Sequence, residues 1–397
     1  MNSYLAHKQH LLPASQVTDV VQATRDIVAL HATDPIGPYL SLWARVPDFQ
    51  REALEDALYE QRTLAKMLCM RVTLHAVPSD EVGLFFQAYS AHRTRPEVRT
   101  FGDFLVQAGL CQEEETDAYL RDLQRRVLDV LAEKGPSTVR QINQAVPELK
   151  TKIRHSVGKA YEGEFSVGSY LVPNIMGAQG LLIRARPRGT WRSNLYEYAA
   201  LSDWLPDVDL ESVTPQDARV WLVRRYLAAF GPATLDDVQW WTGFTKGETE
   251  EALEGLKQEA VEMELDIGDS GAGYLMLADD AQRLRSFTPP ETPYAFFLPS
   301  LDPYIMGYRD RRRFLAAEHH AQVFDRAGNA VPTVWVNGRV VGAWGQRKDG
   351  TVIYGLFGPV GAEERALLQS RRQQLEGFLG GEYLPPRFRT PFTRALE

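Results

Sequence analysis

The sequence predicts an α+β protein with three tandem winged-helix modules and a C-terminal antiparallel β-domain. Two matched segments, each a helix, a Gly-Pro break, a second helix and strand-like runs, predict two of the modules. Helices followed by a strand-like run near the N-terminus predict a third. After about residue 290, short alternating apolar runs with many glycine and aromatic residues predict the β-domain.

The bulk composition is that of an ordinary globular protein with several domains. The chain has 397 residues, of which 44% are hydrophobic and 24% charged. The net charge of −8 argues against a nonspecific binder of polyanions, but it permits basic charge gathered in one channel. Cys69 and Cys111 lie in different segments with no partner at metal-ligand spacing. We therefore expect neither disulfides nor a zinc site, and no cofactor.

The N-terminus shows no signal peptide, and no window approaches the roughly 18 continuous apolar residues of a membrane span. We expect a cytoplasmic, nucleoid-associated protein with no membrane partner.

The first module is predicted over residues 1–115. Apolar spacing predicts helices over 16–30 and 50–64, and two prolines end the first of them. Alternation over 70–77 predicts a strand, and a helix is expected from 79 to about 90.

The second and third modules are predicted over 116–205 and 206–289. In each, a helix ends at Gly-Pro, and a threonine, Thr138 or Thr234, caps the next helix. The strand pairs expected after these helices are 168–172 with 181–186, and 261–265 with 273–277. The alternative is a pair of packed helical hairpins with no role on DNA.

The last domain, 290–397, is predicted to be a small antiparallel sheet or partial barrel. Two dipeptides, Asn337-Gly338 and Asp349-Gly350, predict tight hairpin turns. The strands are expected at 331–336, 339–344 and 351–355, with a helix near 361–378 and an irregular tail after Pro385.

A candidate site lies early in the chain. His31 and Thr33 place two hydrogen-bonding side chains two residues apart on an otherwise apolar run, and Asp34 follows directly. The alternative for His31 is a helix-terminal histidine bonded to backbone. The alternative for Asp34, which precedes Pro35, is a turn or cap.

Four stretches resemble the AlkZ-like (YcaQ-like) winged-helix DNA glycosylase family. They occur in the family's order and extend over nearly the whole chain: Leu30–Arg45, Met70–His75, Leu298–Arg311 and Val323–Asn329. Where the family carries a Gln-x-Gln pair, this chain carries His31 and Thr33.

The resemblance implies a C-shaped arrangement around double-stranded DNA that carries an alkylated purine. It implies base excision repair, in which a monofunctional N-glycosylase removes bulky N7-alkylated guanine. Some relatives act as self-resistance proteins in organisms that make a DNA-alkylating natural product. The resemblance allows the same role, antibiotic self-resistance, for this chain. Three modules in one chain favour a monomer.

The chemistry fits a pair of hydrogen-bonding side chains. N7-alkylated guanine is cationic, so it leaves the sugar without being protonated, and the enzyme must stabilise the sugar cation and place a water. We expect His31 to orient or activate this water, Thr33 to complete its shell, and Asp34 to support the cation.

DNA contacts are expected from basic and polar residues in the resembling stretches. Alternation places Arg71, Thr73 and His75 on one face of a strand, where the alternative is a half-exposed strand edge. The full set is Arg45, Arg71, Thr73, His75, Arg309, Arg311, Arg312 and Arg313. For the arginine run, the alternative is a solvated charge cluster.

A second functional class stays open. The chain could be a non-catalytic winged-helix DNA-binding protein, either a regulator or a factor that sequesters adducts, in which loss of the Gln pair marks loss of activity. In either class, the sequence places no lysine at a recognisable Schiff-base position, which disfavours a lyase.

Overall fold

Tertiary contacts divide the chain into two units. The computed structural model describes residues 1–156, 162–265 and 273–396. Unit 1 comprises Met1–Leu54 and Arg219–Glu397, and unit 2 comprises Glu55–Ala218. Helices and antiparallel strands occur in both units, so the predicted α+β class is confirmed. The predicted bounds of the three modules and the β-domain stay a prediction, because contacts group the N-terminal segment with the C-terminal half of the chain.

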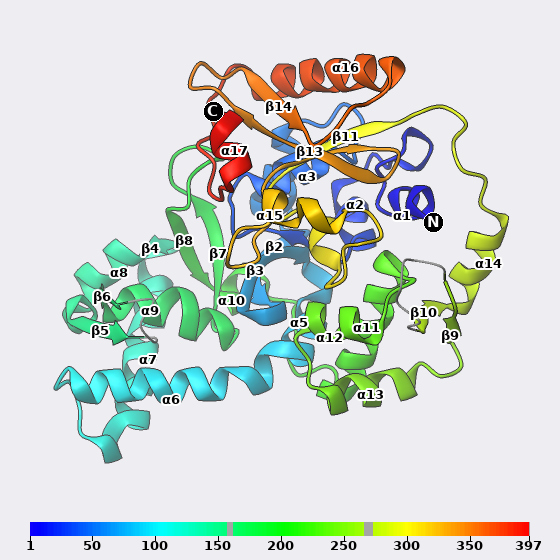
Figure 1. Ribbon diagram of the computed structural model, residues 1–397. Helices are drawn as coiled ribbons and strands as arrows, with labels where there is room; N and C mark the ends of the chain where they lie inside the picture. The colour runs from blue at the N-terminus through cyan, green and yellow to red at the C-terminus, as the bar shows by residue number, and fades with distance from the viewer. Residues whose placement is uncertain (157–161, 266–272, 397) are drawn as a thin grey trace. The chain divides into compact units, whose positions relative to one another are not determined.

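Unit 2 is built on an antiparallel sheet in which strands follow the order β3, β2, β7, β8, β4 (Figure 1). The strands are β2 (Leu64–Cys69), β3 (Thr73–Pro78), β4 (Ser137–Thr138), β7 (Leu182–Pro187) and β8 (Tyr196–Ala200). A separate hairpin pairs β5 (Lys152–Ser156) with β6 (Glu162–Ser166).

The helices of unit 2 include the predicted helix near 79–90, formed by short helical turns around α5. The α-helices are α5 (Val82–Phe85), α6 (Ala91–Gln107), α7 (Thr116–Lys134), α8 (Val139–Ala145), α9 (Val167–Tyr170) and α10 (Leu201–Trp204). The strand expected at 168–172 is wrong, because this segment continues from α9 into a π-helical turn. Strand β2 was not predicted; nearly all of it is buried, so its apolar run does not alternate.

The predicted Gly-Pro repeats share one topology. Thr138 caps α8 and Thr234 caps α12 (Leu235–Thr242), each through a capping box. In the first repeat, β4 pairs with β8, which pairs with β7. In the second, Ala233 bridges to β10, which pairs with β9. The second repeat also contains α11 (Pro215–Phe230), α13 (Lys246–Gly255), β9 (Ala260–Met263) and β10 (Tyr274–Leu277).

The N-terminal segment of unit 1 differs from the prediction near the candidate site. Instead of a helix over 16–30, α2 spans only Val20–Asp26 and is capped by the Asp19 carboxylate, which accepts two backbone N–H groups. Val28 then takes a left-handed conformation with φ 72°, which ends the helix. Leu30–His31 forms the short strand β1, so His31 does not lie at a helix terminus.

The other helices of this segment are α1 (Asn2–Lys8), α3 (Gly37–Trp43) and α4 (Arg51–Glu55). The helix expected over 50–64 ends earlier than predicted. It continues from α4 as a π-helical turn over Asp56–Glu60, and strand β2 follows at Leu64.

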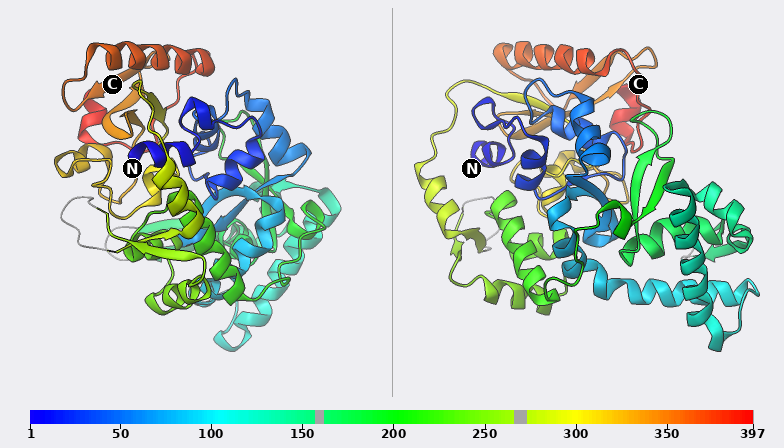
Figure 2. Two further views of the ribbon diagram at one scale, coloured as in Figure 1. Left: turned by 90° about the vertical axis from the view of Figure 1, so that its right-hand side faces the viewer. Right: turned by 180° about the vertical axis from the view of Figure 1, so that it is seen from behind.

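The C-terminal part of unit 1 is an open antiparallel sheet of four strands in the order β11, β12, β13, β14. Figures 1 and 2 show the long helix α16 lying along this sheet. The strands are β11 (Ala295–Leu298), β12 (Thr333–Val336), β13 (Arg339–Gln346) and β14 (Val352–Leu356). The helices of this part are α14 (Ala278–Ser286), α15 (His320–Val323), α16 (Ala362–Leu379) and α17 (Pro391–Leu396).

The antiparallel β-domain and the tight turn at Asn337-Gly338 are confirmed; both turn residues have positive φ, 50° and 73°. The barrel-like expectation is wrong, since β11 and β14 are the two edges of the sheet over the described residues. The tail is not wholly irregular, because it ends in α17.

Aromatic side chains fill the core of the C-terminal part. Trp335 is fully buried, and its ring centroid lies 4.9 Å from that of Tyr304 and 5.0 Å from that of Phe314. These contacts fix the chain around residues 300–315 against the sheet. Over the described ranges, none of the helices has the length and apolar character needed to cross a membrane.

Candidate active site and DNA-contacting residues

The predicted pair lies at and just after β1. His31 keeps 8% of its surface exposed, whereas Leu30 and Ala32 on either side of it are fully buried. Thr33 is half-buried in the bend that follows. His31 is therefore mostly enclosed, its Nδ1 atom is buried, and only a small fraction of the residue's surface is exposed.

Asp34 is a buried carboxylate with a fixed donor. Its Oδ2 accepts a hydrogen bond of 2.9 Å from the Ser300 hydroxyl. Burial raises the pKa of Asp34 above its usual range, and the hydrogen bond from Ser300 and the charge of Arg387 oppose that rise. Asp34 also lines a crevice of about 40 Å³, together with Trp344 and Gln346. The carboxylate therefore faces the C-terminal part of unit 1.

Arg45 lies in the interior, and the structure does not support its predicted contact with DNA. Its side chain is fully buried, and its guanidinium makes two hydrogen bonds of 2.8 Å to the two carboxylate oxygens of Asp302. The Ser41 hydroxyl donates to the same carboxylate at 2.7 Å. A guanidinium engaged in this way has no surface left for a phosphate.

These contacts explain why two of the resembling stretches matter. The links Asp34–Ser300 and Arg45–Asp302 join the Leu30–Arg45 segment to the loop after β11. The polar residues of these stretches therefore hold the loop that carries His31. Some of the residues that carry the resemblance thus stabilise the fold around the candidate site.

The predicted polar strand face at residues 71–75 is also wrong. Arg71 has φ 57° and lies in a 3-10 turn before β3, so it does not share a strand face with the other two. The Thr73 hydroxyl donates to the Met70 carbonyl at 2.7 Å. Thr73 and Arg71 remain half-buried, and their contact with DNA stays a prediction.

His75 is buried beside a cysteine. Its Nδ1 lies 3.1 Å from the Thr73 carbonyl and 3.4 Å from the Cys69 sulfur. Burial lowers the pKa of His75 to about 4, so the ring is neutral at pH 7 and cannot pair with a phosphate as a cation. Burial likewise raises the pKa of the Cys69 thiol to about 12. His75 is thus mostly buried, and its contact with DNA stays a prediction.

Three of the four arginines in the run 309–313 are paired with acids. Arg313 is buried, donates to the Pro232 carbonyl at 2.7 Å and pairs with Asp237 at 3.3 Å. Protein partners engage this buried guanidinium, so the structure does not support its predicted contact with DNA. Asp237 also accepts the backbone N–H groups of Arg309 and Asp310 at 2.8 and 3.0 Å, which fixes the course of the run.

The other three arginines reach the surface. Arg309 is exposed beside Asp236, and Arg312 is exposed beside Asp310. Arg311 is half-buried, and its guanidinium lies 4.2 Å from the ring centroid of Phe324. Exposed ion pairs are weak and exchange readily with another anion. These three arginines are accessible to a phosphate, and their contact with DNA stays a prediction.

Comparison with known proteins decides the family. The family model for AlkZ-like DNA glycosylases matches residues 24–378. The chain belongs to the AlkZ-like DNA glycosylase family. This match contains His31, Thr33 and Asp34, together with all of the exposed arginines discussed above.

Two relatives of the AlkZ-like chain come from Streptomyces sahachiroi. One, named an interstrand DNA cross-link repair glycosylase, is 29% identical over 134 residues, which are 33% of this chain and 34% of that protein. The aligned part thus spans about a third of that relative's length. The solved structure of S. sahachiroi DNA glycosylase AlkZ matches with a TM-score of 0.73 at 19% identity and covers 97% of each chain. This likeness shows a shared fold.

One unusual residue of this AlkZ-like chain was missed from the sequence. Lys66 in β2 is 2% exposed, and its ammonium donates to the Tyr59 hydroxyl at 2.9 Å. Burial, and to a lesser degree the nearby charge of Arg184, lower the pKa of Lys66 to about 7. Its position in an apolar run is the only sequence feature that points to it.

In the part of the chain that the structure describes, the acidic, histidine and cysteine side chains do not gather into a metal site. Over the described ranges, no group of three or more of them is placed to hold a metal ion.

Proposed function

We propose that this protein is a DNA repair N-glycosylase that hydrolyses the N-glycosidic bond of cationic N7-alkylated guanine, including bulky adducts. The observation that carries the proposal is the AlkZ-like family match over residues 24–378. The name of the S. sahachiroi relative, a cross-link repair glycosylase, supports a bulky substrate. The partner is double-stranded DNA, and self-resistance to an alkylating natural product is a compatible role.

In this proposal the chain performs three tasks. His31 orients or activates the attacking water, and Thr33 completes the hydrogen-bonding shell of that water. Asp34, fixed by Ser300, supports the sugar cation through its negative charge. The alkylated base leaves as a neutral group, so no acid is required.

The test is the release of N7-methylguanine from alkylated duplex DNA by wild type and His31→Ala. We expect a loss of about 100-fold or more, as for removal of a general base or a water-positioning group. A matched control is His7→Ala, since His7 lies half-buried on α1, outside the candidate site. Unchanged release by His31→Ala contradicts the assigned role.

The limited exposure of His31 favours one competing function, a DNA-binding protein without catalysis. The same assay separates the two. A glycosylase leaves abasic sites that break on heating in alkali, whereas a non-catalytic binder shifts the adducted duplex and leaves its strands intact.

A further inference from the structure

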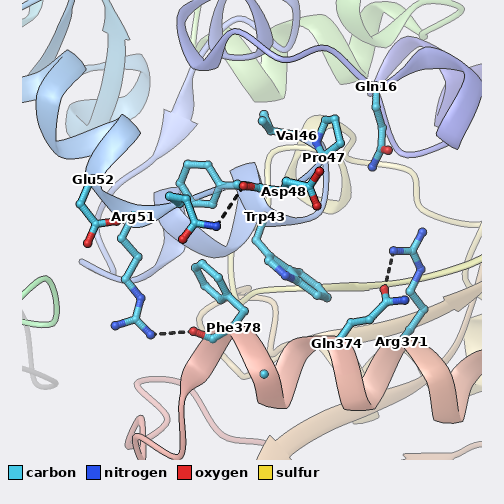
Figure 3. A pocket seen from close by; sticks show the side chains of 13 residues that line it. Gln16, Trp43, Val46, Pro47, Asp48, Arg51, Glu52, Arg371, Gln374 and Phe378 are labelled. Carbon is cyan, nitrogen blue, oxygen red and sulfur yellow. Dashed lines mark hydrogen bonds between the residues drawn. The ribbon is translucent and has the colours of Figure 1, made fainter.

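Unit 1 contains a cavity that is separate from the candidate active site. It lies between the end of α3, the segment 46–52 and α16, and its volume is about 800 Å³ (Figure 3). Small-molecule sites commonly fall within this range of size. His31, Thr33 and Asp34 do not line it, so the chemistry proposed above does not account for it.

One wall of the cavity is aromatic. The ring centroid of half-buried Trp43 lies 6.1 Å from that of Phe378, and the ring centroid of Phe49 lies 5.9 Å from that of Phe378. Figure 3 shows the Trp43 indole extending toward Gln374 and Arg371. An indole face of this kind is a stacking surface for a flat heterocycle.

A cation at the cavity lacks an acidic partner. Half-buried Arg371 donates to the Gln374 side chain at 3.0 Å, and among the described residues it forms no ion pair. Burial alone lowers the pKa of Arg371. By contrast, Arg51 in the same lining is paired with Glu382 at 3.2 Å and donates to the Phe378 carbonyl at 2.8 Å. An enclosed charge without a counter-ion is unfavourable, and a bound anion would relieve this cost.

An exposed carboxylate lies at the rim of the cavity. Asp48 has a left-handed backbone conformation with φ 51°, and it lines the cavity together with the preceding Pro47. A carboxylate has two oxygens that accept adjacent N–H donors. Among the bases, guanine presents such a pair at its Watson–Crick edge, through its ring N–H and its exocyclic amino group.

We propose that this cavity binds a guanine nucleotide. The base stacks on Trp43, its two N–H donors meet the Asp48 carboxylate, and the phosphate is bound by Arg371 with Gln374 beside it. Free GMP and an unpaired guanosine of DNA share this chemistry, and the experiment below separates these two sources. The site does not depend on glycosylase activity.

The experiment is isothermal titration calorimetry of the full chain with GMP, AMP and guanosine, and with a hairpin oligonucleotide that carries one unpaired guanosine. Wild type is compared with Arg371→Gln and Asp48→Asn. The matched control is Arg365→Gln, an exposed arginine on the same helix α16 that does not line the cavity. Thermal unfolding of each variant verifies that it is folded.

We expect Arg371→Gln to weaken GMP binding by about 10-fold or more, as for loss of a charge-assisted hydrogen bond, and to leave guanosine binding unchanged. Asp48→Asn should abolish the preference for GMP over AMP. Binding of the oligonucleotide but not of GMP assigns the site to DNA, and the reverse assigns it to free nucleotide. Absence of saturable binding by both ligands, or equal GMP affinity in wild type and Arg371→Gln, overturns the proposal.

Discussion

Replacement of Asp302 by alanine should strongly destabilise unit 1. The Asp302 carboxylate accepts two bonds from Arg45, one from the Ser41 hydroxyl and one from the Tyr304 backbone N–H, at 2.7–2.9 Å. The side chains of Arg45 and Asp302 are both 0% exposed. Asp302→Ala leaves the guanidinium buried without a counter-ion, which costs about 3–5 kcal/mol. The Ser41 hydroxyl and the Tyr304 amide also lose their acceptor, so we expect the free energy of unfolding to fall by at least about 4 kcal/mol.

Urea unfolding of the full chain, followed by both tryptophan fluorescence and circular dichroism, measures this effect. A slope of about 3 kcal/mol/M converts the loss into a midpoint shift of more than about 1 M. The control is Arg312→Ala, which breaks an exposed ion pair with Asp310 and should cost less than about 1 kcal/mol.

A second variant separates charge from packing. The double replacement Arg45→Met with Asp302→Leu removes both charges and keeps apolar volume, so it should recover most of the stability. An Asp302→Ala protein that loses no more than the Arg312→Ala control would refute the reasoning from burial. A double variant as unstable as Asp302→Ala would show that packing, not charge, dominates.

Three further predictions concern pH and salt. Lys66 has a folded-state pKa of about 7, below the usual 10.5, so the stability of the wild type should rise with pH between these two values. Lys66→Met should stabilise the protein at pH 7 and flatten this rise, and urea unfolding midpoints at several pH values measure both effects. Burial raises the pKa of Asp34 above 3.8, so the stability of the wild type should fall as pH rises above that value. Asp34→Asn should therefore stabilise the protein at pH 7. A stability gain of this variant that is equally large at pH 3.5 would contradict this prediction. Replacement of Arg309 and Arg312 by glutamine should each reduce the log–log salt slope of duplex binding by about 0.9, as measured by fluorescence anisotropy. Arg313→Gln should leave that slope unchanged, and equal slopes in all variants would remove the arginine run from the DNA interface.

Local features of the chain could be predicted from the sequence because their causes are local. Thr138 and Thr234 cap helices through groups three residues away, and Asn337-Gly338 selects its turn through the conformations open to those two residues. The same holds for β12, β13 and β14 of the C-terminal sheet, whose apolar runs and flanking turns are short-range patterns, whereas β11 was not predicted.

Burial of charged residues could not be predicted in this way. Arg45 is enclosed because Asp302 lies 257 positions further along the chain, and Arg313 because Asp237 lies 76 positions before it. An arginine next to an apolar run therefore has the same sequence pattern whether it meets a phosphate or a buried carboxylate. Arg71 leaves its expected strand face for a related reason, since its left-handed backbone depends on the turn between β2 and β3.

The enclosure of Cys69 beside His75 bears on chemical resistance. Burial raises the pKa of the Cys69 thiol to about 12, so very little of it is ionised at pH 7, and the neutral neighbouring ring does not act as a cation that would favour ionisation. Electrophiles react with the ionised form, and this sulfur is also 0% exposed. Reagents that modify nucleic acids by alkylation should therefore leave this position intact in the folded chain.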